Sequence, residues 1–254
     1  MVATEIIQAL FRWIHVIAGI MWIGQLYFFN FVNAVFAPTL DAESKKKVVP
    51  QLMPRALFWF RWGAAWTWVS GILLLALVFY HGGAAFENVT GNWSLGAIVM
   101  VLFTFVSPFV YEALLKTPVG KNLTNSAIAA AVAIALLSLA MIHWAGFSYR
   151  GYVIHIGAIF GTIMAFNVWF RIWPAQQKII TAVRDGQAPD AAVVALAGLR
   201  SKHNTYLSVP LVWAMLNQHT TFAASHWAIL VVVAVIGWHG VEKLYKKSAK
   251  VQGF

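Results

Sequence analysis

The sequence predicts an all-α fold, a polytopic bundle of about seven membrane-spanning helices. Of its 254 residues, 61% are hydrophobic and only 10% are charged, whereas about 25% of the residues in a soluble domain are charged. Several apolar runs exceed the roughly 20 residues that a helix needs to cross the hydrocarbon core. Together these observations indicate a single integral membrane domain over residues 1–254, in contact with a lipid bilayer.

The apolar runs define the predicted spans. They are about 7–35, 57–81, 94–115, 124–146, 151–173, 204–221 and 226–244. Pro174 is expected to end the fifth span, because proline lacks the backbone N–H that continues a helix. The polar stretch that follows, at about 175–202, contains a turn at Asp185-Gly186-Gln187 and a helix start at Asp190. It predicts a short helical hairpin at the cytoplasmic membrane surface.

The basic residues predict the orientation. If the N-terminus is outside and the C-terminus inside, every Lys and Arg except Arg12 and Arg150 falls on the cytoplasmic side. Cytoplasmic loops of membrane proteins carry such an excess of positive charge. The net charge of +10 therefore reflects orientation and contact with anionic lipid, and it does not indicate a nucleic-acid partner.

The histidines are the best indication of chemistry. There are eight in the chain, and His15, His143, His155 and His219 are predicted at nearly one depth on different helices. By helical rise, each lies on the order of 10 Å outside the membrane midplane. An imidazole in hydrocarbon costs free energy unless it has a partner or a function. We interpret these histidines as the wall of a haem or metal site, although any one of them could instead form a structural hydrogen bond between helices.

The other histidines have simpler explanations. His81 and His226 are predicted at the outer water boundary and His203 at the inner interface, where headgroups and water hydrate an imidazole. His239, in the inner half of the last span, fits a packed histidine that is bonded to a neighbouring helix.

The composition restricts the cofactor. The chain has no cysteine, which excludes thiolate ligands, iron–sulfur clusters and covalent c-type haem. Non-covalent haem b needs only axial ligands and an apolar slot. On the first span, His15, Gly19 and Trp22 share a face, and the glycine leaves room for a porphyrin edge. We therefore expect one or two haem b groups with bis-histidine ligation by members of the four-histidine set.

Four stretches together resemble a known family. They are HVIAGIMWIGQLYFFNFV (15–32), PRALFWFRWGAAWTW (54–68), NVWFRIWPAQQKII (167–180) and HNTYLSVPLVWAMLNQH (203–219). Taken in order, they resemble the membrane domain of the bacterial cytochrome c-linked urate hydroxylases, known as the urate oxidase N-terminal domain. The opening His-x-x-x-Gly-x-x-Trp is also similar to small haem- or copper-associated membrane proteins, including the membrane protoporphyrinogen oxidase.

The resemblance implies a multi-pass protein of the bacterial inner (cytoplasmic) membrane and oxidation of urate or a similar donor. It also implies a C-terminal cytochrome c on the outer side, which would need an eighth span. Because about seven spans are predicted and the chain has no Cys, we expect that cytochrome to be lacking. The electron acceptor is then expected to be a separate c-type cytochrome. The resemblance does not assign catalytic residues individually, although His15, His203 and His219 fall inside the matching stretches.

Two functions follow from these patterns. The first is a haem-b-binding membrane oxidoreductase that resembles urate hydroxylase and passes electrons to a separate periplasmic cytochrome. The alternative is a non-catalytic haem-binding or structural subunit of a larger respiratory or photosynthetic membrane complex. A small-solute transporter is disfavoured, because no pair of broken helices indicates a binding site at the midplane.

Overall fold

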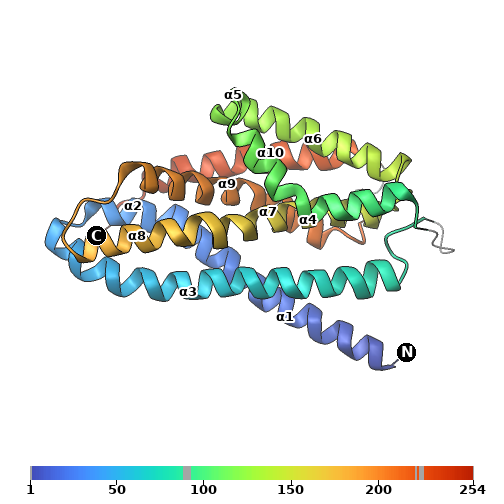
Figure 1. Cartoon of the computed structure of the whole chain (residues 1–254), viewed down its shortest axis with the longest axis horizontal. Helices are drawn as coiled ribbons and strands as arrows, with labels where there is room; N and C mark the ends of the chain where they lie inside the picture. The colour runs from blue at the N-terminus through green and yellow to red at the C-terminus, as the bar shows by residue number, and fades with distance from the viewer. Residues whose placement is uncertain (1, 88–92, 221, 223–225, 254) are drawn as a thin grey trace. The chain divides into compact units, whose positions relative to one another are not determined.

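The computed structural model describes residues 2–87, 93–220, 222 and 226–253, and most of these residues are helical (Figure 1). The elements follow in the order α1 (Val2–Tyr27), η1 (Phe28–Asn33), α2 (Ala34–Phe36), η2 (Ala37–Thr39), α3 (Ala42–Leu74), η3 (Leu75–His81), α4 (Leu95–Leu115), α5 (Pro118–Lys121), α6 (Leu123–His143), α7 (Tyr149–Asn167), η4 (Val168–Ile172), α8 (Trp173–Arg184), α9 (Ala191–Leu216) and α10 (Ala228–Ser248). The prediction of an all-α polytopic bundle is confirmed.

Six helical stretches within the described residues are long and apolar enough to cross a membrane. They are Ala3–Thr39, Ala42–His81, Leu95–Leu115, Leu123–His143, Tyr149–Arg184 and Ala228–Ser248. Helix α9, which contains most of the predicted sixth span, is not among them. Its middle carries Arg200, Lys202 and His203, and this lowers its mean hydropathy. The chain is therefore a multi-pass membrane protein, while the count of seven spans and the orientation stay predictions.

The orientation can be tested by topology reporters. We expect a reporter that is active only outside the cytoplasm to be active when fused at Gly83 and inactive when fused at Gly253, because the basic residues predict an inside C-terminus. A second reporter that is active only in the cytoplasm should give the reciprocal result. A C-terminus outside the cytoplasm would contradict the predicted topology.

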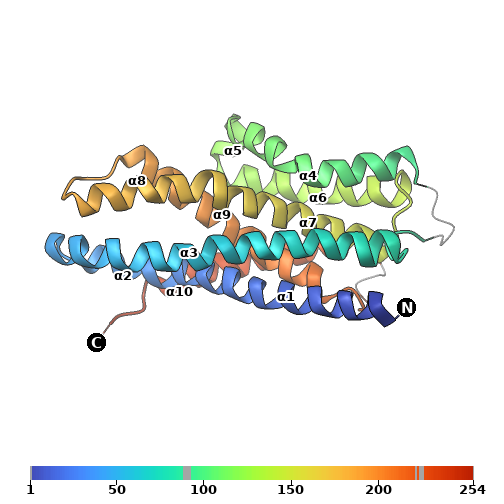
Figure 2. The same ribbon diagram turned by 60° about the horizontal axis from the view of Figure 1, so that its bottom comes forward.

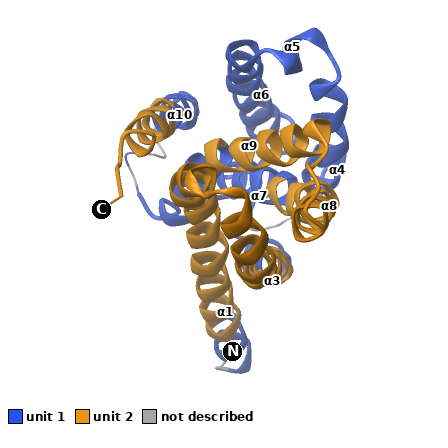
Figure 3. Cartoon of the chain, turned by 90° about the vertical axis from the view of Figure 1, so that its left-hand side faces the viewer, with its two compact units in different colours: residues 1–8, 71–163, 207–238 blue, residues 9–70, 164–206, 239–254 orange. Residues whose placement is uncertain are grey.

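The chain forms two compact units, coloured separately in Figure 3. Unit 1 comprises residues 1–8, 71–163 and 207–238, and unit 2 comprises residues 9–70, 164–206 and 239–254. Long helices contribute to both units. For example, α3 belongs to unit 2 as far as Ser70 and to unit 1 from Gly71.

Unit 1 has an apolar core at the end of η3 and the first half of α7. Leu75, Phe79, Ala85 and Ile154 are buried there together. Helix α4 approaches the end of α6 at Gly96, where a Cβ would lie only 2.6 Å from the carbonyl oxygen of Trp144. Glycine is therefore required at this position by the closeness of the two backbones.

Unit 2 has α1 packed beside α3, as Figure 2 shows. The two backbones approach closely at Gly63, where a Cβ would lie 3.0 Å from the backbone nitrogen of Trp22. Phe29 and Phe60 meet edge to face with ring centroids 5.3 Å apart. Small residues at such crossings let membrane helices pack closely, and dispersion between the packed surfaces then stabilises the pair.

The helix does not end at Pro174, contrary to the expectation from the sequence. The backbone stays helical from Tyr149 to Arg184, and Pro174 lies in the first turn of α8. The turns before it form the π-helix η4, in which the N–H of Trp173 bonds to the carbonyl of Val168. A widened turn of this kind relieves the clash between a proline ring and the preceding turn.

The polar stretch after α8 turns back on itself. Gly186 has a φ of +73°, in the left-handed region that favours glycine. Asp190 then caps α9, because its Oδ1 accepts a hydrogen bond of 2.7 Å from the backbone N–H of Ala192. The location of this turn on the cytoplasmic surface stays a prediction.

Candidate functional site

His155 is the most completely buried of the four histidines predicted to form the site. It lies on α7 in unit 1 and has no exposed surface. Its Nδ1 is 2.7 Å from the carbonyl oxygen of Gly151, one helical turn earlier. A carbonyl only accepts, so Nδ1 carries the proton and Nε2 has the lone pair. That Nε2 accepts a hydrogen bond of 2.9 Å from the hydroxyl of Tyr80.

The segment after η3 holds Tyr80 in place. The backbone N–H of Ser148 donates to the carbonyl of Ala85 at 2.9 Å, and the Ser148 hydroxyl donates to the carbonyl of Ala84 at the same distance. Gly151 lies directly on this segment, since a Cβ there would overlap the carbonyl oxygen of Ala85. The contacts fix the end of η3 against the start of α7, and this places the Tyr80 hydroxyl at the His155 ring.

His15 has a comparable arrangement in unit 2. Its Nδ1 is 3.1 Å from the Ser70 hydroxyl oxygen, and that hydroxyl donates its own proton to the carbonyl of Trp66 at 2.5 Å. Ser70 must therefore accept from an Nδ1–H of His15. The Thr67 carbonyl is a further partner of the ring, and it lies on the same side, 3.2 Å from the Ser70 oxygen. Nε2 of His15 is thus left as the nitrogen with the lone pair.

Gly19 and Trp22 lie on the same face of α1 as His15. A Cβ on Gly19 would meet nothing closer than the Thr67 side chain at 3.9 Å. Trp22 is 2% exposed, and its indole N–H is buried without a hydrogen-bond partner among the described residues. A buried donor in that state costs free energy unless a ligand or water accepts from it.

His143 and His219 are in different surroundings. His143 is the last residue of α6, His219 lies in the turn after α9, and both are exposed in unit 1. Among the residues that the structure describes, no three His, Asp or Glu side chains gather closely enough to hold a metal ion. A bis-histidine haem needs only two imidazoles, so this observation bears on a multi-ligand metal site and leaves the haem prediction untested.

The remaining histidines lie at surfaces or at a partly covered position. His81, His226 and His239 are exposed, and His203 is half-buried. Nδ1 of His226 accepts a hydrogen bond of 3.1 Å from the backbone N–H of Ala228, whereas Nδ1 of His15 and of His155 carries a proton.

Unit 2 also contains a buried polar network around Asn30. The Asn30 amide donates to the Ser201 hydroxyl at 2.8 Å, and its oxygen accepts from the Tyr245 hydroxyl at 2.8 Å. A neighbouring set joins α7 to α9, where the Asn167 amide donates to Asn204 at 2.9 Å. Asn30 lies inside the π-helix η1, and Asn167 immediately precedes η4. The widened turns η1 and η4 therefore occur where helices bond through asparagine, which the sequence pattern does not reveal.

A second polar group lies in unit 1, where the start of α7 meets the end of α9. The Tyr149 hydroxyl donates to the backbone carbonyl of Asn217 at 2.7 Å, which joins the start of α7 to the end of α9. Gln218 is 7% exposed, and its amide donates to the carbonyl of Ala214 at 2.6 Å. The guanidinium of Arg150 lies 5.8 Å from the centre of the Phe79 ring. Sequence reasoning used Arg150 for orientation alone and missed Gln218, because neither residue belongs to a recognisable motif.

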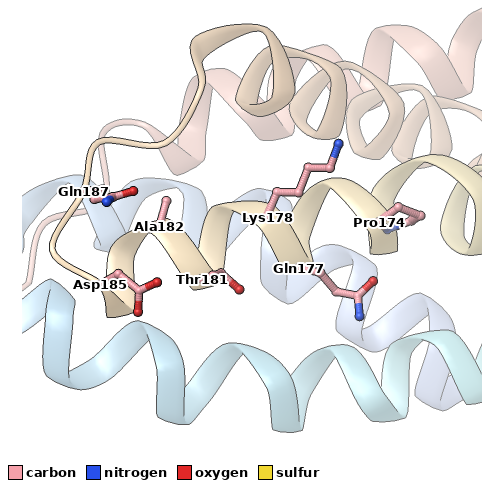
Figure 4. Close-up of a pocket in the computed structure, with 7 residues that line it drawn as sticks. All are labelled: Pro174, Gln177, Lys178, Thr181, Ala182, Asp185 and Gln187. Carbon is pink, nitrogen blue, oxygen red and sulfur yellow. The ribbon is translucent and has the colours of Figure 1, made fainter.

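A cavity on unit 2 lies along α8, as Figure 4 shows. Its volume is 560 Å³, and it is lined by Pro174, Gln177, Lys178, Thr181, Ala182, Asp185 and Gln187. The neighbouring Arg184 guanidinium, 2.8 Å from the Asp185 carboxylate, lowers the pKa of Asp185. This open polar hollow contains no imidazole, so we do not associate it with the predicted haem.

A family model described as urate oxidase N-terminal matches residues 39–252. The chain belongs to the urate oxidase N-terminal family. The matched region includes His143, His155 and His219, together with Tyr80 and Gly151, and it begins after His15. No curated protein and no solved structure matches the chain. Membership of the urate oxidase N-terminal family therefore rests on the sequence pattern. Three of the four quoted stretches lie within the matched region, and the stretch 15–32 lies before it.

Proposed function

We propose that this member of the urate oxidase N-terminal family is a haem-b-binding membrane oxidoreductase of the bacterial inner membrane. In this proposal it oxidises urate or a similar small donor and passes the electrons to a separate periplasmic c-type cytochrome. The observation that supports the proposal most is the shared state of His15 and His155. Each has its Nδ1–H engaged by an acceptor, so that its lone pair is on Nε2.

This state is the one that an axial haem ligand requires. Ligating histidines in proteins donate the second ring N–H to a carbonyl, hydroxyl or carboxylate, which orients the ring and raises its basicity. Ser70 fulfils that function for His15, and the Gly151 carbonyl fulfils it for His155. The unpartnered indole N–H of Trp22 lies on the His15 face of the helix and suits a bound group that carries acceptors.

The two histidines do not fit equally well. Nε2 of His155 already accepts from Tyr80, and its ring packs on Phe147 with centroids 4.5 Å apart. The Tyr80 hydroxyl would have to leave before this nitrogen could bind iron. At His15, no described side chain hydrogen-bonds to Nε2, and a Cβ on Gly19 would reach only ordinary contact with Thr67. His15 is therefore the better candidate ligand.

Haem b supplies a one-electron carrier when it is bound. The residues of this chain hold and orient the axial imidazoles and keep water from the buried ring of His155. A hydroxylation that takes its oxygen from water releases two electrons and two protons for each substrate, so two molecules of a one-electron cytochrome are needed to accept them. The aromatic and aliphatic surroundings of both histidines favour the retention of a non-covalent porphyrin.

One observation favours the alternative, a non-catalytic structural or haem-binding subunit. The bond between Tyr80 and His155 satisfies both side chains without a ligand, as a purely structural hydrogen bond between helices would. In that case His155 holds η3 against α7 and takes no part in electron transfer.

Electron transfer from urate distinguishes the two functions. We expect the purified protein, in detergent or nanodiscs, to reduce an added c-type cytochrome when urate is supplied, at a rate proportional to protein concentration. The control is the same assay without urate and with heat-denatured protein. A haem-loaded protein that gives no urate-dependent reduction with any c-type cytochrome of its own organism would favour the non-catalytic alternative.

A further inference from the structure

Arg150 is a cation at the start of α7, in unit 1, that has no anionic partner in the described residues. Its guanidinium lies near the Phe79 ring, and its Nε is buried without a hydrogen-bond partner among those residues. A ring contact at 5.8 Å stabilises a cation only weakly. A buried donor on a guanidinium normally finds an acceptor, since leaving it unpaired is costly. The Arg150 guanidinium therefore lacks a negatively charged hydrogen-bond acceptor.

Gln218 carries an unsatisfied group of the opposite kind, a hydrogen-bond acceptor. Its side chain is 7% exposed, and the bond from Nε2 to the Ala214 carbonyl fixes which end of the amide is the oxygen. That Oε1 is buried and accepts no hydrogen bond from any described residue. This oxygen lacks a hydrogen-bond donor, so water or a ligand N–H is needed to satisfy the amide.

The two unsatisfied groups lie at neighbouring helix ends, the start of α7 and the turn after α9. Arg150 follows Tyr149, and Gln218 follows Asn217. The hydrogen bond of 2.7 Å from the Tyr149 hydroxyl to the Asn217 carbonyl joins these two positions. Tyr152, which is 4% exposed, packs on Tyr149 with ring centroids 5.8 Å apart. The Tyr149 ring is partly exposed and provides a surface on which a flat ligand can stack.

We infer that Arg150 and Gln218 form a binding site for a small planar anion that presents an N–H beside its anionic oxygen. The guanidinium binds the anionic edge, and the Gln218 oxygen accepts from the neighbouring N–H. Cyclic ureides and oxidised purines belong to this chemical class, whereas simple carboxylates and phosphates lack the N–H. The inference rests on the proposed function and assigns to its substrate two residues of unit 1.

Equilibrium binding of two probes to the full-length protein tests the site. Urate offers both an anionic edge and N–H groups, and benzoate offers an anionic edge alone. We expect wild-type protein to bind urate more tightly than benzoate. Arg150→Gln should weaken both probes by about tenfold or more, because a charge-assisted hydrogen bond is lost. Gln218→Leu should weaken urate by about fivefold and leave benzoate unchanged.

The controls address folding and charge. Arg150→Lys keeps the positive charge and loses the planar fork, so we expect urate affinity between wild type and Arg150→Gln. Arg12→Gln removes the other arginine predicted on the outer side and should change neither probe. Thermal stability in the same detergent identifies a variant that fails to fold, in which case Arg150→Lys and Gln218→Leu decide the result.

Haem spectra of the same samples separate this inference from the proposed function. Saturable urate binding in a protein without haem would support the site and overturn the haem proposal. A haem-loaded protein whose urate affinity is unaffected by Arg150→Gln and Gln218→Leu would overturn the site alone. An absence of saturable urate binding to the wild-type protein would also overturn it.

Discussion

Replacing His15 by alanine is expected to abolish the haem absorbance of the purified protein or to shift it to that of a five-coordinate haem. The imidazole is held by Ser70 so that Nε2 presents its lone pair, and alanine offers no ligand in its place. The measurement is the haem content per protein and the position of the reduced bands. Ser70→Ala should keep the ligand but weaken haem binding by about 10- to 100-fold, the usual effect of losing the partner of a ligating histidine.

The same series assigns the other predicted ligands. His143→Ala and His219→Ala test the two exposed candidates, and His239→Ala, also exposed, is a matched control that should change nothing. If His15→Ala retains wild-type haem content and band positions, His15 is a packing residue. A second ligand is identified by a second substitution with an equally large effect.

Tyr80→Phe distinguishes the two interpretations of His155. If His155 binds iron, removing the Tyr80 hydroxyl frees Nε2, so the haem should be retained or bound more tightly. If the bond between Tyr80 and His155 is structural, both Tyr80→Phe and His155→Ala should leave the spectrum unchanged and lower the thermal stability. A hydrogen bond of this kind contributes about 0.5–1.5 kcal/mol to the free energy of unfolding.

The second large effect is expected from Gly151→Ala. The added methyl group would overlap the carbonyl oxygen of Ala85, which is a backbone atom and also accepts from the Ser148 N–H. The segment that holds Tyr80 must then move away from α7. We expect the free energy of unfolding to fall by about 1–3 kcal/mol, as for other overpacked sites, with a lower midpoint of thermal unfolding in detergent.

Gly198→Ala is the matched control for this substitution. Gly198 is exposed in the interior of α9, and a Cβ there would meet no atom within 4 Å. Alanine should therefore stabilise the helix by about 0.5–1 kcal/mol through its higher helix propensity. Equal stability changes for Gly151→Ala and Gly198→Ala would show that the approach of Ala85 to α7 is not a tight contact.

Hydropathy and helical periodicity were sufficient to predict the fold class. Apolar runs of about 20 residues predict helices because the backbone must satisfy its hydrogen bonds internally in hydrocarbon. The continuity through Pro174 was not predictable in the same way. It depends on a π-helical turn at residues 168–172, and the local sequence offers no simple pattern for such a widened turn.

The sequence predicts a common depth for four histidines, which stays a prediction, but it could not predict their hydrogen-bond partners. His15 bonds to Ser70 across 55 positions of the chain, and His155 bonds to Tyr80 across 75. Periodicity places a side chain on one face of one helix and does not indicate which helix packs against that face. For this reason His155 and the exposed His219 appeared equivalent in the sequence, whereas their environments differ completely in the structure.

The polar group of Arg150 and Gln218 illustrates the same limit of sequence patterns. Arg150 and Gln218 lie 68 residues apart, like the Tyr149–Asn217 pair that joins their helices. An unsatisfied hydrogen-bonding group is a property of three-dimensional packing, because it depends on which partners are absent around it. Composition and spacing therefore could not identify these residues.

The central claim is that the chain binds haem b, and the most direct measurement is a reduced-minus-oxidised absorbance spectrum of the purified wild-type protein. The protein should be produced under haem-replete conditions, and haem should be quantified per polypeptide. We expect the bands of a six-coordinate b-type haem, one or two per chain, that is extractable into acidified organic solvent because no cysteine links it. A correctly inserted, haem-replete preparation that shows no haem bands would contradict the claim.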